Sequence, residues 1–139
     1  MRLSKNAKVD LLKRTPLFEG CSKAELGTLA TMSDELGLRP GTVLTREGRR
    51  GREFFVLIDG TVAVTQNGKQ IAELGAGEWF GEVALLTDLP RTATVTATSQ
   101  VRVLVITDRS FRQAVRTMPS IALKVLEKVG ERIHSDAER

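Results

Sequence analysis

The segment Phe80–Val95, which reads FGEVALLTDLPRTATV, combines residue types whose order suits the binding of an anion. Gly81 has no side chain, so the backbone at this position can approach a ligand closely. The next residues, Glu82–Leu86, are good helix formers with an acid in the first turn. The start of a helix presents unpaired N–H groups and a partial positive charge, which favour a phosphate group. The segment therefore indicates a candidate phosphate-binding site.

A helix-ending tripeptide and a predicted strand complete this segment and would position its arginine. Asp88-Leu89-Pro90 ends the helical run, and Arg91 follows directly. Residues 92–98 then alternate in character and are rich in β-branched side chains, which predicts a strand. Taken one at a time, Glu82 and Arg91 are more typical of solvated charges or of a plain salt bridge. Their register within the whole segment favours a binding site.

The complete segment resembles the phosphate-binding cassette of cyclic nucleotide-binding domains. These domains occur in cyclic-nucleotide-dependent kinases, in gated channels and in bacterial transcription regulators of the catabolite-activator type. The glycine, the acid, the apolar run, the proline, the arginine and the Ala-Thr-Val tail all match the cassette without a gap. The resemblance covers residues 15–135, nearly the whole chain, and it implies a β-jelly-roll flanked by helices.

The resemblance implies a role for each matching position. The carboxylate of Glu82 would accept a hydrogen bond from a ribose 2′-hydroxyl, and the guanidinium of Arg91 would pair with the exocyclic phosphate. The N–H groups of Ala84 and Thr92 would donate to the same phosphate, and Gly81 would line the ribose. The ligand-binding residues implied in this way are Gly81, Glu82, Val83, Ala84, Leu85, Arg91, Thr92 and Ala93.

The purine base of such a ligand would need an apolar wall. Val62 and Val64 share one face of a predicted strand. Together with Ile71 and Leu74 they are candidates for this wall, although ordinary core packing explains each of them equally well. In the family, the last helix closes over the base, and a core or dimer stripe is the alternative interpretation of that helix. The candidates for base contacts on it are Val129, Arg132, Ile133 and His134.

Composition excludes several classes of protein. The chain has 139 residues, an apolar content of 41% and a net charge of +4, which fits one domain that is neither disordered nor membrane-embedded. The longest apolar run, Phe54–Ile58, is far too short to span a membrane, and residues 1–14 lack the apolar core of a secretory signal. The single cysteine, Cys21, cannot form an internal disulfide, which favours a cytoplasmic location.

Apolar spacing and glycine turns predict the elements of the fold. One helix is expected over residues 4–14, and a capping box at Ser22–Glu25 predicts a second over residues 23–32. Dipeptides such as Asn67-Gly68 then separate short β-prone runs, and such dipeptides are strong hairpin signals. The predicted strands are residues 35–39, 42–46, 53–59, 61–66, 69–74, 78–80, 91–98 and 101–107. Further helices are predicted over residues 110–117 and 119–135, the last of them interrupted by Gly130.

The predicted fold class is therefore mainly β, because the even spacing of the strands favours an antiparallel roll closed on itself. We expect an eight-stranded antiparallel β-jelly-roll with N-terminal helices and two C-terminal helices. The chain is expected to form a single domain over residues 1–139. Its parts would be helices in residues 1–33, the roll with the cassette 80–95 in residues 34–108, and C-terminal helices acting as a lid in residues 109–139.

Other chemistries lack the residues that they need. The chain has one histidine, His134, and one cysteine, too few for a metal cage or an iron–sulfur site. A catalytic triad is not credible with a histidine on a terminal helix. His134 stays open as one axial ligand of a haem. The arginine-rich run of residues 46–52 also holds acids and no aromatic interleaving, which favours a solvated turn over a nucleic-acid patch. The chain ends too soon after the last helix for a helix-turn-helix, so we expect no DNA binding by this chain alone.

The sequence thus predicts a non-catalytic sensing domain that binds a cyclic purine nucleotide, with cyclic AMP favoured, and that transmits binding through the C-terminal helix. Many family members have alanine or serine where Thr92 follows Arg91. The resemblance links threonine there to cyclic GMP, because its hydroxyl can meet the guanine 2-amino group. A cGMP-selective version of the same sensor is therefore one alternative, and a protein–protein interaction module with an unoccupied cassette is the alternative from another class. No cofactor is expected, and a homodimer or an effector protein remain open as partners.

Overall fold

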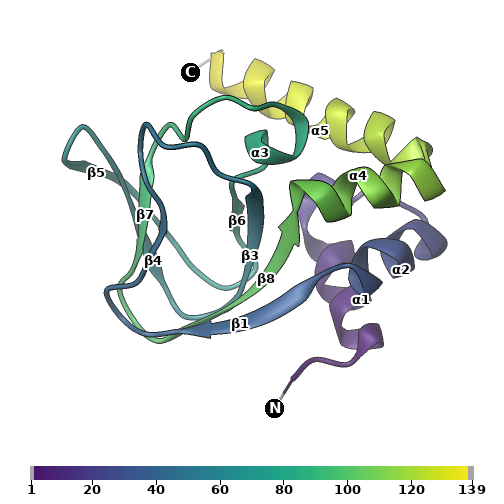
Figure 1. Ribbon diagram of the computed structural model, residues 1–139, viewed down its shortest axis with the longest axis horizontal. Coiled ribbons are helices and arrows are strands. Elements are labelled where there is room, and N and C mark those ends of the chain that lie inside the picture. Colours follow the sequence, from purple (N-terminus) through teal and green to yellow (C-terminus); the bar gives the residue numbers. More distant parts are fainter. Residues whose placement is uncertain (1, 138–139) are drawn as a thin grey trace.

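The computed structural model describes the backbone of residues 2–137 and the side chains of residues 2–131. Within these residues, eight strands form two antiparallel four-stranded sheets, and most of the helices gather beside one of them (Figure 1). The first sheet has the order β1 (Asp34–Leu38), β8 (Val101–Thr107), β3 (Glu53–Asp59) and β6 (Trp79–Phe80). The second sheet has the order β2 (Val43–Thr45), β7 (Thr94–Ala97), β4 (Val62–Gln66) and β5 (Lys69–Leu74).

The helices precede, interrupt and follow the strands. They are α1 (Lys5–Arg14), the 3-10 helix η1 (Pro16–Phe18), α2 (Lys23–Thr31), α3 (Val83–Leu86), α4 (Asp108–Thr117) and α5 (Ser120–Ala137). The predicted fold class, an eight-stranded roll with N-terminal and C-terminal helices, is confirmed. None of the helices in the described range is both long enough and apolar enough to cross a lipid bilayer.

Some elements differ from the predictions in their boundaries or were not predicted. Strand β7 begins at Thr94 rather than at residue 91, because the N–H of Arg91 donates to the carbonyl of Arg49 in the loop between β2 and β3 over 2.8 Å. Helix α4 begins at Asp108 rather than at residue 110, because the hydroxyl of Thr107 caps it. The 3-10 helix η1 was not predicted, although a proline suits its first position.

The sheet that contains β3 and β8 is covered on both faces. On β3, Phe54 and Val56 pack into the core between this sheet and the helices. Phe55 and Leu57 point to the other face and pack into the core between the two sheets. Because side chains alternate along a strand, a strand that is buried on both faces must be apolar throughout. This explains the continuous run Phe54–Ile58.

Glu25 links α2 to the beginning of α5. Its side chain is buried, and it accepts hydrogen bonds from the N–H of Ser22 over 2.7 Å, from Nζ of Lys124 over 2.5 Å and from the hydroxyl of Ser120. Burial acts to raise the pKa of Glu25, but these hydrogen bonds outweigh it and lower the pKa to about 2. The neighbouring Cys21 is half-buried, and burial together with Glu25 raises its pKa to about 11 against the opposing effect of Lys124.

We expect Glu25→Gln to lower the free energy of unfolding at neutral pH by about 1–3 kcal/mol, because Lys124 loses its charged partner. The folded pKa of Glu25 lies below the ordinary value of 4.5. The stabilisation is therefore fully present above that value and is lost as the pH falls toward the folded pKa of about 2. Urea unfolding of the variant and the wild type at neutral pH and at about pH 3 measures the difference, which should shrink in acid.

Glu19→Gln is a matched control for this experiment. The carboxylate of Glu19 also pairs with a lysine of α5, Lys128, but over 3.8 Å and with 68% of the Glu19 side chain exposed. Exposed ion pairs contribute little to stability, so the free energy of unfolding of Glu19→Gln should equal that of the wild type at both pH values. If Glu25→Gln destabilised the protein equally at neutral and acid pH, the assigned carboxylate–lysine pair would be contradicted.

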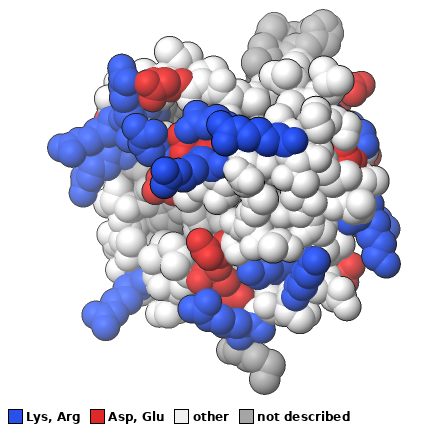
Figure 2. All heavy atoms as spheres, turned by 45° about the vertical axis from the view of Figure 1, so that its right-hand side comes forward, with Lys and Arg blue, Asp and Glu red and all other residues white. Residues whose placement is uncertain are grey.

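The arginine-rich loop of residues 46–52 is exposed, and two of its arginines form ion pairs. Arg50 pairs with Asp88 over 2.6 Å, and Arg52 pairs with Asp108 over 3.4 Å. Figure 2 shows basic and acidic side chains lying among one another on one face of the molecule. These pairs agree with the interpretation of the loop as a solvated turn.

Candidate ligand-binding site

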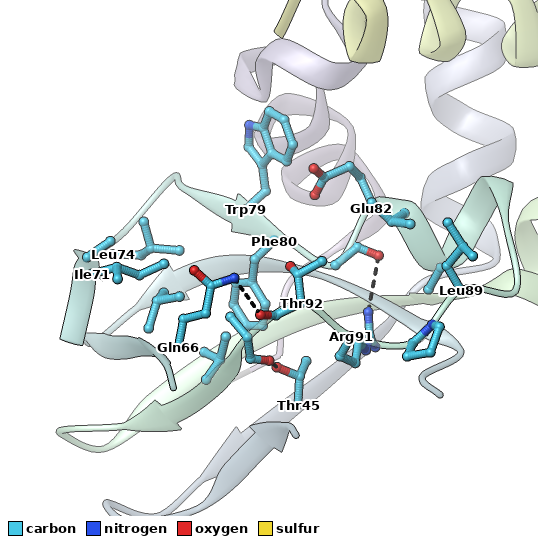
Figure 3. Close-up of a pocket in the computed structure, with 18 residues that line it drawn as sticks. Thr45, Gln66, Ile71, Leu74, Trp79, Phe80, Glu82, Leu89, Arg91 and Thr92 are labelled. Atoms are coloured by element: carbon cyan, nitrogen blue, oxygen red, sulfur yellow. Dashed lines mark hydrogen bonds between the residues drawn. The ribbon is translucent and has the colours of Figure 1, made fainter. Parts of the chain in front are cut away.

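A cavity of about 290 Å³ lies between the cassette, β6 and the sheet that contains β4 and β5 (Figure 3). One side of its wall is apolar and comes from strands, including Val64 of β4 and Leu74 of β5. The other side comes from the cassette, whose backbone turns at Gly81 into α3 and returns at Arg91. An apolar wall that faces a charged wall is the combination expected of a site for a small amphipathic anion.

The predicted cassette residues converge on this cavity with one exception. Those that line it are Gly81, Glu82, Val83, Ala84, Arg91, Thr92 and Ala93. Leu85 does not line it, since its side chain points away from the cavity and packs in the core between the first sheet and the helices. The helix α3 therefore has one side on the cavity and another on the core.

The predicted base-contact residues divide into three groups. Val64, Ile71 and Leu74 line the cavity. Val62 is fully buried in the core between the sheets, and Val129 packs against the core on the helical side, so neither lies in the cavity wall. The side chains of Arg132, Ile133 and His134 lie outside the described residues.

Sequence reasoning missed several residues that line the cavity. The amide Nε2 of Gln66 donates to the carbonyl oxygen of Thr92 over 3.0 Å, and the hydroxyl of Thr45 donates to the carbonyl oxygen of Ala93 over 3.0 Å. These bonds join positions 26 and 48 residues apart, so no local pattern reveals them. The other cavity-lining residues not predicted are Ala72, Trp79, Phe80, Leu89, Pro90 and Val95. For all of these except Ala72, the signal was their position within or beside the cassette.

Arg91 is held within the wall of the cavity, with only 8% of its side chain exposed. Its Nη2 donates to the carbonyl oxygen of Glu53 over 2.7 Å, and its Nη1 donates to that of Gly81 over 3.4 Å. Burial lowers the pKa of Arg91, against the opposing effect of the carboxylates of Glu53 and Glu82. A guanidinium nevertheless stays protonated in proteins, so the wall of the cavity carries a positive charge.

The Nε of Arg91 stands apart from the other buried polar side-chain atoms of the described residues. It is the only such nitrogen or oxygen for which no hydrogen-bond partner is found. A buried donor without a partner costs about 1–3 kcal/mol. The hydrogen bonds of the guanidinium go to two neutral carbonyl oxygens, and the carboxylate of Glu53 pairs with it over a longer distance of 3.7 Å. An anion in the cavity would be a stronger hydrogen-bond acceptor than the carbonyl oxygens.

Gly81 allows the backbone to pass close to this guanidinium. Its φ of +87° lies in the left-handed region, which favours glycine. A Cβ at this position would lie 2.8 Å from the carbonyl oxygen of Glu53 and 2.9 Å from Nη1 of Arg91. The close approach expected at Gly81 is therefore made to the protein's own backbone and to Arg91.

The first turn of α3 begins beside the cavity. The N–H of Ala84 donates to the carbonyl oxygen of Gly81 over 3.1 Å, so it already has an acceptor within the turn. Glu82 directly precedes the helix, and Figure 3 shows its carboxylate extending toward Trp79 rather than toward the guanidinium of Arg91. The carboxylate and the guanidinium can therefore contact different parts of one ligand.

Comparison with known proteins identifies relatives whose sequences are similar to part of this one. The sequence profile described as "Cyclic nucleotide-binding domain" matches residues 35–118. The cAMP-dependent protein kinase regulatory subunit of Yarrowia lipolytica is 36% identical over 104 residues, which cover 73% of this chain and 28% of that protein. The cGMP-dependent protein kinase of Toxoplasma gondii is 32% identical over 117 residues, which cover 84% of this chain and 12% of that protein. The chain thus spans less than a third of either relative.

A solved structure shows the same arrangement of sheets and helices. The N-terminal domain of a transcriptional regulator from Streptomyces coelicolor A3(2) superposes with a TM-score of 0.82 and 28% sequence identity, covering 93% of this chain and 94% of that one. The profile match, the relatives and this structure agree with the resemblance seen in the cassette. The chain belongs to the cyclic nucleotide-binding domain family, a family of regulatory, non-catalytic domains with the jelly-roll fold.

Proposed function

We propose that the cavity binds the sugar phosphate of a cyclic purine nucleotide. The observation that carries this proposal is the buried guanidinium of Arg91, which lines the cavity and keeps an unpartnered Nε. It is hydrogen-bonded to backbone carbonyl oxygens, and the carboxylate of Glu53 lies 3.7 Å from its Nη2. In the proposed complex its donors turn to the phosphate, and the carboxylate of Glu82 accepts the ribose 2′-hydroxyl. Val83, Ala84, Thr92 and Ala93 complete the cassette side of the cavity.

The base would lie against the strand side of the cavity. Val64, Ile71 and Leu74 present aliphatic side chains there, and Ile71 is 56% exposed. A bound purine would cover this apolar surface, which favours binding. We propose cyclic AMP as the main ligand, on the basis of the regulatory subunit that the chain resembles. The exposed hydroxyl of Thr92 and the similarity to a cGMP-dependent kinase support some binding of cyclic GMP.

Binding would reach the C-terminal helix through α3. Ala84 lines the cavity, whereas its neighbour Leu85 packs in the same core as Ile121 and Val125 of α5. A ligand that draws the cassette inward would move both sides of this short helix together. The proposed output is a shift in the population of α5 positions, read by an effector protein or a second copy of the chain. In this proposal residues 1–139 act as one regulatory domain without catalytic activity.

Thermal unfolding with cyclic AMP, cyclic GMP and 5′-AMP tests the proposed ligand class. At 100 times its dissociation constant, a ligand of the folded state should add about 2.7 kcal/mol of stability. For a chain of this size we expect the midpoint temperature of thermal unfolding to rise by roughly 5–15 °C. 5′-AMP has the same base and sugar but an open, more highly charged phosphate, so it should shift the midpoint much less. No shift with either cyclic nucleotide would favour an interaction module whose cassette stays empty.

A further inference from the structure

The loop between β2 and β3 runs alongside the cassette. The N–H of Gly48 donates to the carbonyl of Arg91, and the N–H of Arg91 donates to the carbonyl of Arg49, each over 2.8 Å. Gly51 comes two residues later in this loop, just before β3. The backbone bonds therefore fix Gly51 beside the cassette.

The side chain of Arg91 lies directly against Gly51. A Cβ on Gly51 would lie 1.9 Å from Nε of Arg91, 2.3 Å from its Cζ and 2.4 Å from its Nη2. These separations are far below any van der Waals contact, so no other amino acid fits while the guanidinium keeps this position. Gly51 is not among the glycines with positive φ, so its backbone is open to other residues. What glycine supplies here is space.

A move away from Gly51, toward the cavity that Arg91 lines, would cost the guanidinium its present contacts. Its Nη2 is bonded to the carbonyl oxygen of Glu53, and its Nη1 approaches Gly81, where an added Cβ would itself come within 2.9 Å. Gly51 and Gly81 thus leave the space in which the guanidinium of Arg91 is held. A methyl group at residue 51 would force the guanidinium out and break its 2.7 Å bond to Glu53.

We infer that Gly51 is a positioning residue for the ligand site: its missing side chain makes the niche that holds Arg91 ready beside the cassette. This inference rests on the proposed function, in which Arg91 takes the phosphate. An arginine displaced from the niche has to be ordered again when the ligand binds, and that ordering lowers affinity. Gly51 itself touches no ligand in this arrangement.

A double-mutant cycle on Gly51 and Arg91 tests the inference. We expect Gly51→Ala to weaken cyclic AMP binding by about tenfold, measured by displacement of a fluorescent cyclic nucleotide. In an Arg91→Ala background the same change should alter the dissociation constant less than about twofold, because the displaced side chain is gone. Gly37→Ala is the matched control, since its added methyl meets nothing within 4 Å and its φ is not in the left-handed region.

A second measurement follows Arg91 without any ligand. The buried Nε–H of Arg91 should exchange slowly with water in NMR spectra of the wild type and of Gly37→Ala, and rapidly in Gly51→Ala. Slow exchange in Gly51→Ala would overturn the inference. So would an affinity loss of the same size with and without the Arg91 side chain, which indicates general damage to the fold.

The two proposals fail in different ways. If Arg91→Ala weakens binding and Gly51→Ala does not, the phosphate role of Arg91 stands and the positioning role of Gly51 is wrong. If neither cyclic nucleotide binds the wild type, or if Arg91→Ala binds like the wild type, the proposed function is wrong. The exchange of the Nε–H then still decides whether Gly51 positions the guanidinium.

Discussion

Arg91→Ala is expected to weaken cyclic nucleotide binding by about 10- to 100-fold, since hydrogen bonds to charged groups contribute about 1.5–3 kcal/mol. The variant removes the one guanidinium that the described structure places in the wall of the cavity, together with all of its N–H donors. The affinity of Arg91→Lys for cyclic nucleotides should lie between those of Arg91→Ala and the wild type, because a lysine keeps the charge but lacks the planar guanidinium. Isothermal titration with cyclic AMP and cyclic GMP gives the affinities directly.

The loss of affinity in Arg91→Ala must be distinguished from an effect of removing any positive charge from the protein. Arg46→Ala removes the same charge from the exposed loop between β2 and β3, and Arg46 does not line the cavity. This control should bind cyclic AMP within about twofold of the wild type, because exposed charges are screened by salt. Equal affinities for Arg91→Ala and Arg46→Ala would rule out the phosphate role of Arg91.

Phe54→Ala is expected to produce the largest loss of stability, about 3–5 kcal/mol. The ring of Phe54 is completely buried between β3 and the helices. It packs edge-on against Phe18 with centroids 5.7 Å apart, and it lies 6.1 Å from Trp79 in a tilted arrangement. Its removal would leave a cavity where the N-terminal segment, β3 and β6 meet. Urea unfolding at neutral pH measures the effect.

Phe54→Leu provides the control for this prediction. A leucine fills much of the same volume, so Phe54→Leu should lower the free energy of unfolding by less than about 1.5 kcal/mol. Both substitutions change only the side chain, so the backbone pairing of β3 with β8 is the same in the two variants. The carbonyl oxygen of Glu53, the residue before Phe54, also still accepts from Arg91 in both. If Phe54→Ala unfolded at the same urea concentration as the wild type, the packing of the helices against β3 would be contradicted.

The sequence was sufficient to predict the number of strands in the described chain and their approximate positions along it. Turns such as Asn67-Gly68 punctuate the roll, and at Asn67 the backbone adopts the left-handed conformation that such turns require. The cassette was also predictable, because its glycine, acid and arginine act within one short stretch of chain. Local physical chemistry decides both features, so both are visible in the order of the residues.

The other half of the site could not be predicted, because it depends on contacts between distant segments. The shortest contact of Glu53 with Arg91 is made by its backbone carbonyl, which carries no signature of residue type, and its carboxylate lies farther away at 3.7 Å. Gln66 and Thr45 contribute side chains, but only the pairing of strands brings them to the cassette. Val62 and Val64 illustrate the same limit, since they share a strand and a chemical type, yet Val64 lines the cavity and Val62 lies in the core.

The high pKa of Cys21 has a practical outcome for fluorescence experiments. With a pKa of about 11, only about one thiol in ten thousand is a thiolate at neutral pH, and the thiolate is the form that reacts with maleimides and iodoacetamides. A cysteine introduced at the exposed position Leu126 of α5 should therefore react first. A dye placed there can report on the position of this helix while the native thiol is left unchanged.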